Sequence, residues 1–408
     1  MIGRIQLWSY NYDPEPTGIG PVSTVTARQL QDAGYRVDVV AAHPHYPEPQ
    51  WGSRARPYRE VRDGISILRL PLWVGRATTA ERYRQELSFM AAQTAAIPVL
   101  GSPDLAIVVS PSFPALLPAI VNARVRRIPW ILWLHDILPD GAAATGIIDS
   151  GTVLRVARRL ERLAYREAGR IVVASRPFVA NLREKGVPDH RIRLIYAPAT
   201  REPSRPRVPR KKDPLRILSM GNLGFSQGLA ALVRAFEAPG ALPEDLDVRL
   251  VITGSGVAAN DCRQEIRSDR VQMLGLVDSD RLEEELLRAD LAFVSQQYDG
   301  SEFNIPSKLM NFMAYGLPVL AAVNPGGEVA RLVQEAGAGW IVDSAVPQTF
   351  PQQVAAITAD RAALAQRAKA SRAYADAHFT RQAFARRFIE AIEETRSLVS
   401  WKPPASSP

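Results

Sequence analysis

The segment from Asn304 to Ala321 combines the residue types of an anion-binding turn with those of a short helix and a buried strand. Pro306 suits the first turn of a helix, where its missing N–H costs nothing. The N–H groups of Ser307 and Lys308 would then lie at the positive end of the helix dipole. Lys308 adds a full charge and Ser307 a hydroxyl, so a diphosphate could be held by backbone, dipole and side chains together. The alternative is an ordinary helix–strand unit with a solvated lysine.

Two stretches of alternating apolar strands and helical patterns must position this turn. Short apolar runs separated by helices are typical of parallel sheets covered on both faces. We expect an α/β protein with a Rossmann-like domain at 1–197, a Pro/Arg-rich linker at 198–213, a second Rossmann-like domain at 214–378, and a C-terminal helix and tail at 379–408. The C-terminal helix is expected to pack back across the linker.

Residues that directly follow predicted strands are the remaining candidates for a site. Doubly wound sheets bind ligands at the carboxyl ends of their strands, so two such domains would bring these residues to one cleft. From the first half the candidates are Gly18, Gly20, His135 and Asp136, and from the second half Gly221, Asn222, Gln227, Gly254, Leu276 and the segment 300–308.

Composition limits the classes of protein. The chain has 408 residues, of which 46% are hydrophobic, and a single cysteine, so it has no internal disulfide and fits a reducing compartment. No apolar run is long enough to span a bilayer. We therefore expect a cytoplasmic protein, with peripheral attachment to the inner face of the membrane as an option. The net charge of +8 favours a phosphate-rich partner. Nucleic acid is disfavoured, because aromatic residues do not interleave with the basic ones.

The order of several motifs resembles retaining glycosyltransferase family 4. The motifs are His-Asp-x-x-Pro at 135–139, Gly-Asn-x-Gly at 221–224, Thr-Gly-Ser-Gly at 253–256, Pro-Ser-Lys-Leu at 306–309 and Gly-x-Pro-Val at 316–319. Within the family, the motifs look most like the group that assembles colanic acid, capsule and O-antigen. The resemblance implies a GT-B fold of two facing Rossmann-like domains. It also implies that the first domain binds the acceptor and that the second domain binds most of a nucleoside-diphosphate sugar (UDP-, GDP- or TDP-linked), with no further cofactor. We expect no metal.

The same resemblance assigns residues to the donor, with departures from the family pattern. Asn311 stands where a glutamate commonly grips the ribose, and Glu302 is one residue out of register with the glutamate that contacts the sugar. Asn222 and Gln227 stand where many members carry Arg and Lys, so Lys308 must carry more of the diphosphate charge. Asn304, Ile305, Ser307 and Leu309 complete the donor-binding set predicted around this motif.

The chemistry of transfer gives Lys308 a catalytic role, because negative charge grows on the departing diphosphate. In the retaining front-face mechanism that the family implies, the leaving phosphate takes the acceptor proton and His135 orients the donor sugar. The alternative is an inverting reaction with His135 or Asp136 as general base. Asp278-Ser279-Asp280 imitates a metal-binding motif, but its position before a predicted helix favours an N-cap.

The acceptor side is less defined. His45, Tyr46 and Trp51 belong to a loop rich in histidine, proline and aromatic residues, which we expect to contact an acceptor. The segment from Trp73 to Phe89 is either a basic amphipathic segment on the inner leaflet or a helix at the rim of the cleft. If the segment lies on the membrane, a glycan or polyprenyl-diphosphate-linked acceptor is expected. A sugar-nucleotide hydrolase or epimerase, and a catalytically degenerate basic membrane-binding module, remain alternatives.

Overall fold

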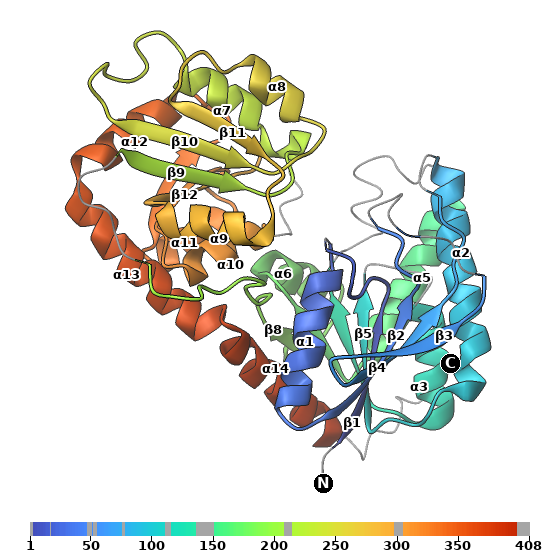
Figure 1. The fold of residues 1–408 in the computed structure, drawn as a ribbon. Helices are drawn as coiled ribbons and strands as arrows, with labels where there is room; N and C mark the ends of the chain where they lie inside the picture. Colours follow the sequence, from blue (N-terminus) through green and yellow to red (C-terminus); the bar gives the residue numbers. More distant parts are fainter. Residues whose placement is uncertain are drawn as a thin grey trace. The chain divides into compact units, whose positions relative to one another are not determined.

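The computed structural model describes residues 3–16, 18–46, 51, 55–75, 78–110, 116–135, 151–207, 214–297 and 305–397. The chain divides into two compact units, each built on its own sheet (Figure 1). Unit 1 comprises Met1–Tyr196 with Phe384–Pro408, and unit 2 comprises Ala197–Ala383. The domain limits predicted from the sequence stay predictions, and we describe each unit by itself.

The sheet of unit 1 has eight strands in the order β3-β4-β2-β1-β5-β6-β7-β8 in the described residues. Every pairing is parallel except that of β3 with β4. The central strands are continuous apolar runs, as expected for a parallel sheet that is covered on both faces. The strands are β1 (Arg4–Ser9), β2 (Arg36–Ala42), β3 (Tyr58–Arg62), β4 (Ile65–Leu70), β5 (Leu105–Ser110), β6 (Trp130–Leu134), β7 (Arg170–Val173) and β8 (Ile192–Leu194).

Helices cover both faces of this sheet (Figure 1). On one face α2 packs on α3, and α3 packs on α5. On the other face the rings of Phe384 and Phe388, from α14, lie 5.8 and 5.0 Å from that of Trp133. The helices of unit 1 are α1 (Gly20–Asp32), α2 (Thr79–Ala96), η1 (Ile97–Val99), α3 (Leu116–Arg126), α5 (Gly151–Glu167), α6 (Arg176–Glu184), η2 (Asp189–Arg191) and α14 (Arg381–Arg396), which begins in unit 2.

The sheet of unit 2 has six parallel strands in the order β11-β10-β9-β12-β13-β14. Its core includes the stacked rings of Phe293 and Phe350, whose centroids are 4.6 Å apart. The strands are β9 (Leu215–Met220), β10 (Val248–Thr253), β11 (Val271–Gly275), β12 (Leu291–Ser295), β13 (Val319–Val323) and β14 (Gly339–Asp343). The helices are η3 (Phe225–Gln227), α7 (Leu229–Phe236), α8 (Ala259–Gln264), α9 (Ser279–Arg288), α10 (Ser307–Ala314), α11 (Glu328–Glu335), α12 (Thr349–Ala359) and α13 (Arg361–His378).

The hairpin of β3 and β4 was missed by the sequence analysis. A two-residue loop, Asp63-Gly64, joins the strands, and both residues have positive φ (49° and 78°). Asp-Gly between alternating residues is the strongest short-range signal for such a hairpin. The signal was therefore present in the sequence.

The predicted fold class, two α/β units with parallel sheets, is confirmed. One local prediction was wrong: Pro306 is not inside the first turn but is the N-cap of α10, with extended backbone (ψ 126°). Ser307 and Lys308 are therefore the first two helical residues, and their N–H groups have no partner within the helix. Within the described residues, no helix is long and apolar enough to cross a membrane.

Candidate functional site

The strand order of unit 2 marks where a ligand would bind. From β9 the chain proceeds outward through β10 to β11, and β12 then pairs on the other side of β9. Open parallel sheets bind ligands outside the carboxyl ends of the strands at such a switch point. The loop 221–228 follows β9 at this point, and the segment that leads from β12 to α10 follows the other strand.

Three glycines bring the backbone loops at these strand ends close together. Gly221, Gly254 and Gly256 have φ of 106°, 127° and 158°. A Cβ on Gly254 would lie 1.9 Å from the carbonyl oxygen of Gly221. A Cβ on Gly256 would lie 2.5 Å from the carbonyl oxygen of Leu223, whose own N–H donates to the carbonyl of Ser255 (2.9 Å). Only glycine fits where two backbones approach this closely.

Lys308 is the second residue of α10, and its side chain points into this group of loops. Its Cε is 3.9 Å from the position that a Cβ on Gly221 would occupy. Its Nζ donates to Oε1 of Gln227 at 2.9 Å, and Nε2 of Gln227 donates to the carbonyl of Asn222. Lys308 is 9% exposed. Among the described residues no carboxylate forms an ion pair with it, so a buried cation has only a neutral amide as its partner.

Burial lowers the pKa of Lys308 to about 8. Desolvation disfavours the charged form, and a neutral amide compensates little of that cost. An anion at the start of α10 would remove the penalty, because it would pair with the ammonium and accept from the first N–H groups of the helix. The prediction of a solvated lysine, the alternative interpretation of this motif, does not fit the structure.

Asn311 faces another part of unit 2. Its Oδ1 accepts the N–H of Thr200 (2.8 Å) and that of Arg201 (3.1 Å), and its Nδ2 donates to Oγ1 of Thr200 at 3.2 Å. The side chain is buried and holds the segment at 200–201 against α10. Contact with a ribose stays a prediction, and it would require Asn311 to give up some of these bonds. Ile305 and Leu309 lie on either side of the helix start, with Leu309 in the core.

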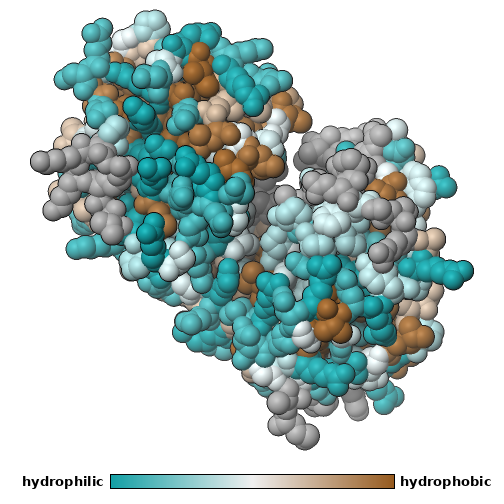
Figure 2. All heavy atoms as spheres, viewed as in Figure 1, coloured by the Kyte–Doolittle hydropathy of each residue, from teal (hydrophilic) through white to brown (hydrophobic). Residues whose placement is uncertain are grey.

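Three exposed apolar side chains surround the strand ends, and the sequence analysis identified only one of them. Phe225, Val257 and Leu276 follow β9, β10 and β11 and are 65%, 71% and 81% exposed. Figure 2 shows apolar side chains at the surface near these strand ends. An aromatic ring next to Gly224 and Gly228, in a loop at a switch point, was the signal that could have found Phe225.

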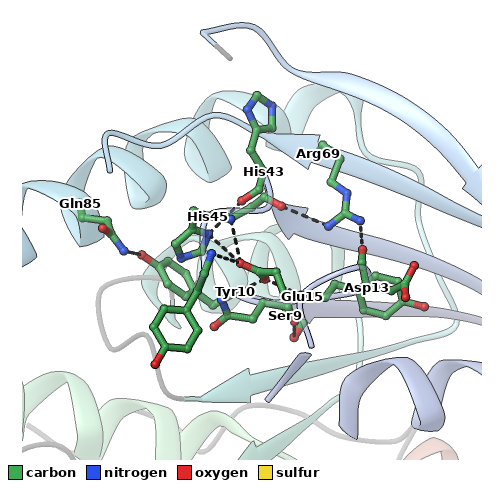
Figure 3. A network of polar contacts seen from close by, with 12 residues as sticks. Ser9, Tyr10, Asp13, Glu15, His43, His45, Arg69 and Gln85 are labelled. Carbon is green, nitrogen blue, oxygen red and sulfur yellow. Dashed lines mark hydrogen bonds and ion pairs between the residues drawn. The ribbon is translucent and has the colours of Figure 1, made fainter. Parts of the chain in front are cut away.

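The corresponding strand ends of unit 1 hold a buried carboxylate, Glu15 (Figure 3). Its Oε1 accepts the N–H of His45 and that of Tyr46, both at 2.8 Å. Its Oε2 accepts from Nδ2 of Asn11 (3.0 Å) and from the N–H of Tyr12 (3.2 Å). Glu15 thus joins the loop after β1 to the loop after β2. The sequence analysis did not select it.

Two of the predicted acceptor residues, His45 and Tyr46, lie next to this carboxylate. His45 has a fully buried side chain whose Nδ1 donates to the carbonyl of His43 (2.9 Å) and lies 3.3 Å from Glu15. The ring therefore positions the loop, and contact of His45 with an acceptor stays a prediction. Tyr46, by contrast, is exposed and directly follows it. Trp51 is half-buried, and its acceptor contact stays a prediction.

The glycine loop at the start of α1 packs against the backbone of Glu15. Gly20 is the first residue of α1, and a Cβ there would lie 3.0 Å from the carbonyl oxygen of Glu15. Gly18 has a φ of 67°, which favours glycine, and its Cβ position is open. Both positions lie at the β1 side of the switch between β1 and β5. Their contact with a donor stays a prediction.

His135 directly follows β6, and its ring lies 4.6 Å from that of Trp133. Burial lowers the pKa of His135 to about 3, so the imidazole is neutral at physiological pH. Its Nε2 is buried and has no hydrogen-bond partner among the described residues. A neutral imidazole can donate one hydrogen bond and accept another. It is a weak general base here, because the pKa of its protonated form is low. Asp136, Glu302 and Asn304 lie outside the described residues.

Family models match both units. A model described as "Glycosyl transferase 4-like domain" matches residues 17–198, and one described as "Glycosyl transferases group 1" matches residues 200–374. The two matches together cover most of the chain. The chain belongs to the GT-B glycosyltransferases of the family 4 type. The resemblance stated from the motifs is thereby confirmed.

Individual proteins similar to this glycosyltransferase share modest identity with it. The probable glycosyltransferase WbjE of Pseudomonas aeruginosa is 27% identical over 52% of this chain and 55% of its own, so the match spans about half the length of that relative. The putative colanic acid biosynthesis glycosyl transferase WcaI of Escherichia coli is 26% identical over 81% of this chain and 86% of its own. The crystal structure of Anabaena HepE in complex with UDP has a TM-score of 0.65 and 15% identity, and the match covers 96% of this chain and 100% of that one.

The metal-like motif of this glycosyltransferase is a helix cap. Asp278 is the N-cap of α9, and its Oδ1 accepts the N–H of Arg281 at 2.8 Å. The N-cap prediction is confirmed. Within the described residues, no group of three or more His, Cys, Asp or Glu side chains is arranged to hold a metal ion.

Proposed function

We propose that this glycosyltransferase moves a sugar from a nucleoside-diphosphate sugar to a glycan or lipid-linked acceptor of a bacterial surface polysaccharide. The observation that carries the proposal is the buried ammonium of Lys308 at the N-terminus of α10, which lies next to Gly221 and, among the described residues, is paired only with an amide. Such a place demands an anion, and it lies at the switch point where a donor is expected. The names of WcaI and the UDP complex of HepE support the same class of reaction.

In the proposed reaction the bond between the anomeric carbon and the diphosphate breaks, and an acceptor hydroxyl bonds to that carbon. The electron pair of the broken bond stays on the diphosphate, which also receives the acceptor proton. Lys308 and the N–H groups at the start of α10 stabilise the charge that grows on the leaving group, so they bind the transition state better than the ground state. No cofactor or metal takes part in these steps as we propose them.

We propose retention of the anomeric configuration. The low pKa of His135 supports this part of the proposal, because an inverting reaction needs a general base with a pKa near the working pH. A neutral His135 would instead orient a sugar hydroxyl through Nε2, the atom without a partner among the described residues. Phe225 and Leu276 would flank the base of the donor, because both are exposed at the strand ends.

Calorimetric titration with UDP-, GDP- and TDP-sugars tests the donor site. Lys308→Met keeps the length of the side chain and removes its charge, and we expect at least about tenfold weaker binding of the best donor, because a charged hydrogen bond in a buried place is lost. Lys369→Met, on the exposed surface of α13 in the same unit, is the control and should bind like wild type. Equal affinity of wild type and Lys308→Met would exclude Lys308 from the site.

Product analysis separates transfer from the related reactions. A transferase consumes donor only when an acceptor is present, and the new linkage keeps the anomeric configuration of the donor, which NMR coupling constants report. Release of free sugar without acceptor would indicate a hydrolase. Conversion to an isomeric sugar nucleotide would indicate an epimerase.

A further inference from the structure

One helix of unit 1 is apolar on both of its faces. The inner residues of α3, which include Leu116, Ala119 and Ile120, are buried in the core. The outer residues Leu117, Val121 and Val125 are spaced by four and are 41%, 42% and 75% exposed. Residues four apart form one ridge along a helix. An apolar ridge on a helix is normally covered by a neighbouring element, so this ridge lacks a cover in the described chain.

The neighbouring helix continues the pattern. In α2, Tyr83 and Leu87 are exposed with the same spacing, and Ala91 and Ala95 extend the row. Val99, in the turn η1 that follows α2, is also exposed. Because α2 packs on α3, the two apolar rows belong to one layer of the unit (Figure 1).

The third helix of the layer supplies positive charge. On α5 the exposed side chains are Val156 and five arginines, which are Arg155, Arg158, Arg159, Arg162 and Arg166. Its two acidic residues are turned inward: Glu161 bonds to Tyr165 and Lys185, and Glu167 forms a bidentate pair with Arg124 of α3. The described part of α3 has no acidic residue. The layer therefore presents apolar rows beside arginines, with no exposed carboxylate on α3 or α5.

We infer that the outer surface of α2, η1, α3 and α5, here called the α2–α5 face, docks on a membrane whose surface carries anionic phospholipid. Apolar side chains that enter the headgroup region together with arginines that bind phosphates are what such a surface requires. A second copy of the chain fits poorly, because a two-fold contact buries this face of both copies, and the described residues of α3 and α5 offer no exposed carboxylate to pair with the arginines. The inference rests on the proposed function in one respect, since it would place the enzyme at a lipid-linked acceptor.

The face differs from the one suggested by the sequence. For the segment from Trp73 to Phe89 the sequence left two alternatives, a membrane segment and a helix at the rim of the cleft. Only its helical part, with Tyr83 and Leu87, belongs to the α2–α5 face. Trp73 is exposed but lies under the guanidinium of Arg84, at 4.3 Å from the ring centroid. The larger contribution comes from α3 and α5, whose outward residues are apparent only when burial is known.

Co-sedimentation of the full chain with vesicles tests the inference. Wild type should pellet with equimolar phosphatidylcholine and phosphatidylglycerol, should not pellet with phosphatidylcholine alone, and should be released by high salt. Replacing Arg158, Arg159 and Arg162 together by glutamine should weaken binding on the order of 100-fold, because each basic residue near an anionic surface contributes about 1 kcal/mol, or about a factor of five. Replacing Leu117, Val121 and Val125 together by serine should weaken it even at low salt.

A matched control removes the same charge elsewhere. Arg249, Arg263 and Arg267 are exposed on unit 2, and their triple replacement by glutamine should leave vesicle binding unchanged. Wild type that stays in the supernatant, or equal loss in both arginine triples, would overturn the inference. So would a dimer in sedimentation velocity that the serine triple dissociates, because the face would then bind a second copy. Donor titration of the same proteins is independent of lipid, so a failure of the proposed function would be seen separately.

Discussion

Two buried charged side chains, Glu15 in unit 1 and Lys308 in unit 2, are compensated in opposite ways. Glu15 accepts four hydrogen bonds, three from backbone N–H groups and one from Asn11. Lys308 donates one hydrogen bond, to the neutral amide of Gln227, and forms no ion pair among the described residues. Both lie at the carboxyl ends of a parallel sheet, where ligands bind, so their positions alone do not distinguish them.

The difference in partners separates a scaffold from a binding site. A buried charge whose partners all belong to the chain holds loops together, and nothing is left for a ligand to satisfy. A buried charge with too few partners costs stability, and that cost is recovered only when a ligand brings the missing charge. We therefore expect removal of Glu15 to destabilise the fold and removal of Lys308 to stabilise it.

Glu15→Ala should have the largest effect. It leaves the N–H groups of Tyr12, His45 and Tyr46 without their acceptor in a buried place, and each such group costs roughly 1–3 kcal/mol. We expect the free energy of unfolding of unit 1 to fall by at least about 3 kcal/mol. Urea denaturation with and without the substitution measures it.

Glu15→Gln is the control for shape. It keeps one oxygen for His45 and Tyr46 but turns an NH₂ group toward Asn11 and Tyr12. The free energy of unfolding should therefore fall by about half as much as in Glu15→Ala. If Glu15→Ala unfolds at the same urea concentration as wild type, the carboxylate does not join the two loops and the comparison with Lys308 fails.

Lys308→Met should act in the opposite direction. Below about pH 8 the lysine is protonated in both states, and the folded state bears the full cost of burying the charge. A pKa lowered from 10.5 to about 8 corresponds to roughly 3 kcal/mol, so the ligand-free variant should be more stable than wild type by up to about that amount. As pH rises from about 8 toward 10.5, Lys308 loses its proton in the folded state before it does in the unfolded state. The difference in stability between the variant and wild type should therefore disappear.

Thermal unfolding of the two proteins without donor checks this prediction. Lys369→Met, from the exposed surface of α13, removes a charge without burial and should not change the stability. A variant less stable than wild type at neutral pH would mean that Lys308 has a compensating partner.

The sequence predicted Lys308 and failed to predict Glu15 for a physical reason. A proline followed by Ser-Lys and an apolar run is a local signal, since the helix start and its lysine are neighbours in the chain. Two of the four partners of Glu15, the N–H groups of His45 and Tyr46, lie 30 and 31 residues away, in a loop that only the pairing of β1 with β2 brings near. The same limit explains why the bonds of Asn311 to Thr200 and Arg201 were not predicted, since their partners are more than a hundred residues apart in the chain.

Strand positions were predicted better than surfaces. Apolar runs mark buried strands whatever their partners are, and the parallel strands of both sheets, apart from β4, were predicted to within a few residues. The ridge of Leu117, Val121 and Val125 has the same composition as a core helix face, so nothing in the sequence distinguishes its outward side. The β3–β4 hairpin shows the opposite case, in which an Asp-Gly signal was available and not used.

The smallest expected effect is on the pH dependence of donor binding. The free enzyme holds the Lys308 proton with a pKa of about 8, and a bound diphosphate raises that pKa because it stabilises the charged form. The affinity of wild type should therefore be constant below about pH 8 and fall up to about tenfold for each unit above it. Lys308→Arg keeps a charge that does not titrate in this range, so its profile should be flat. Calorimetric titration across this range makes the measurement, since both phosphates of the donor stay ionised throughout. A flat profile for wild type would show that Lys308 already carries a stable charge without donor, and the contrast between the two buried groups would disappear.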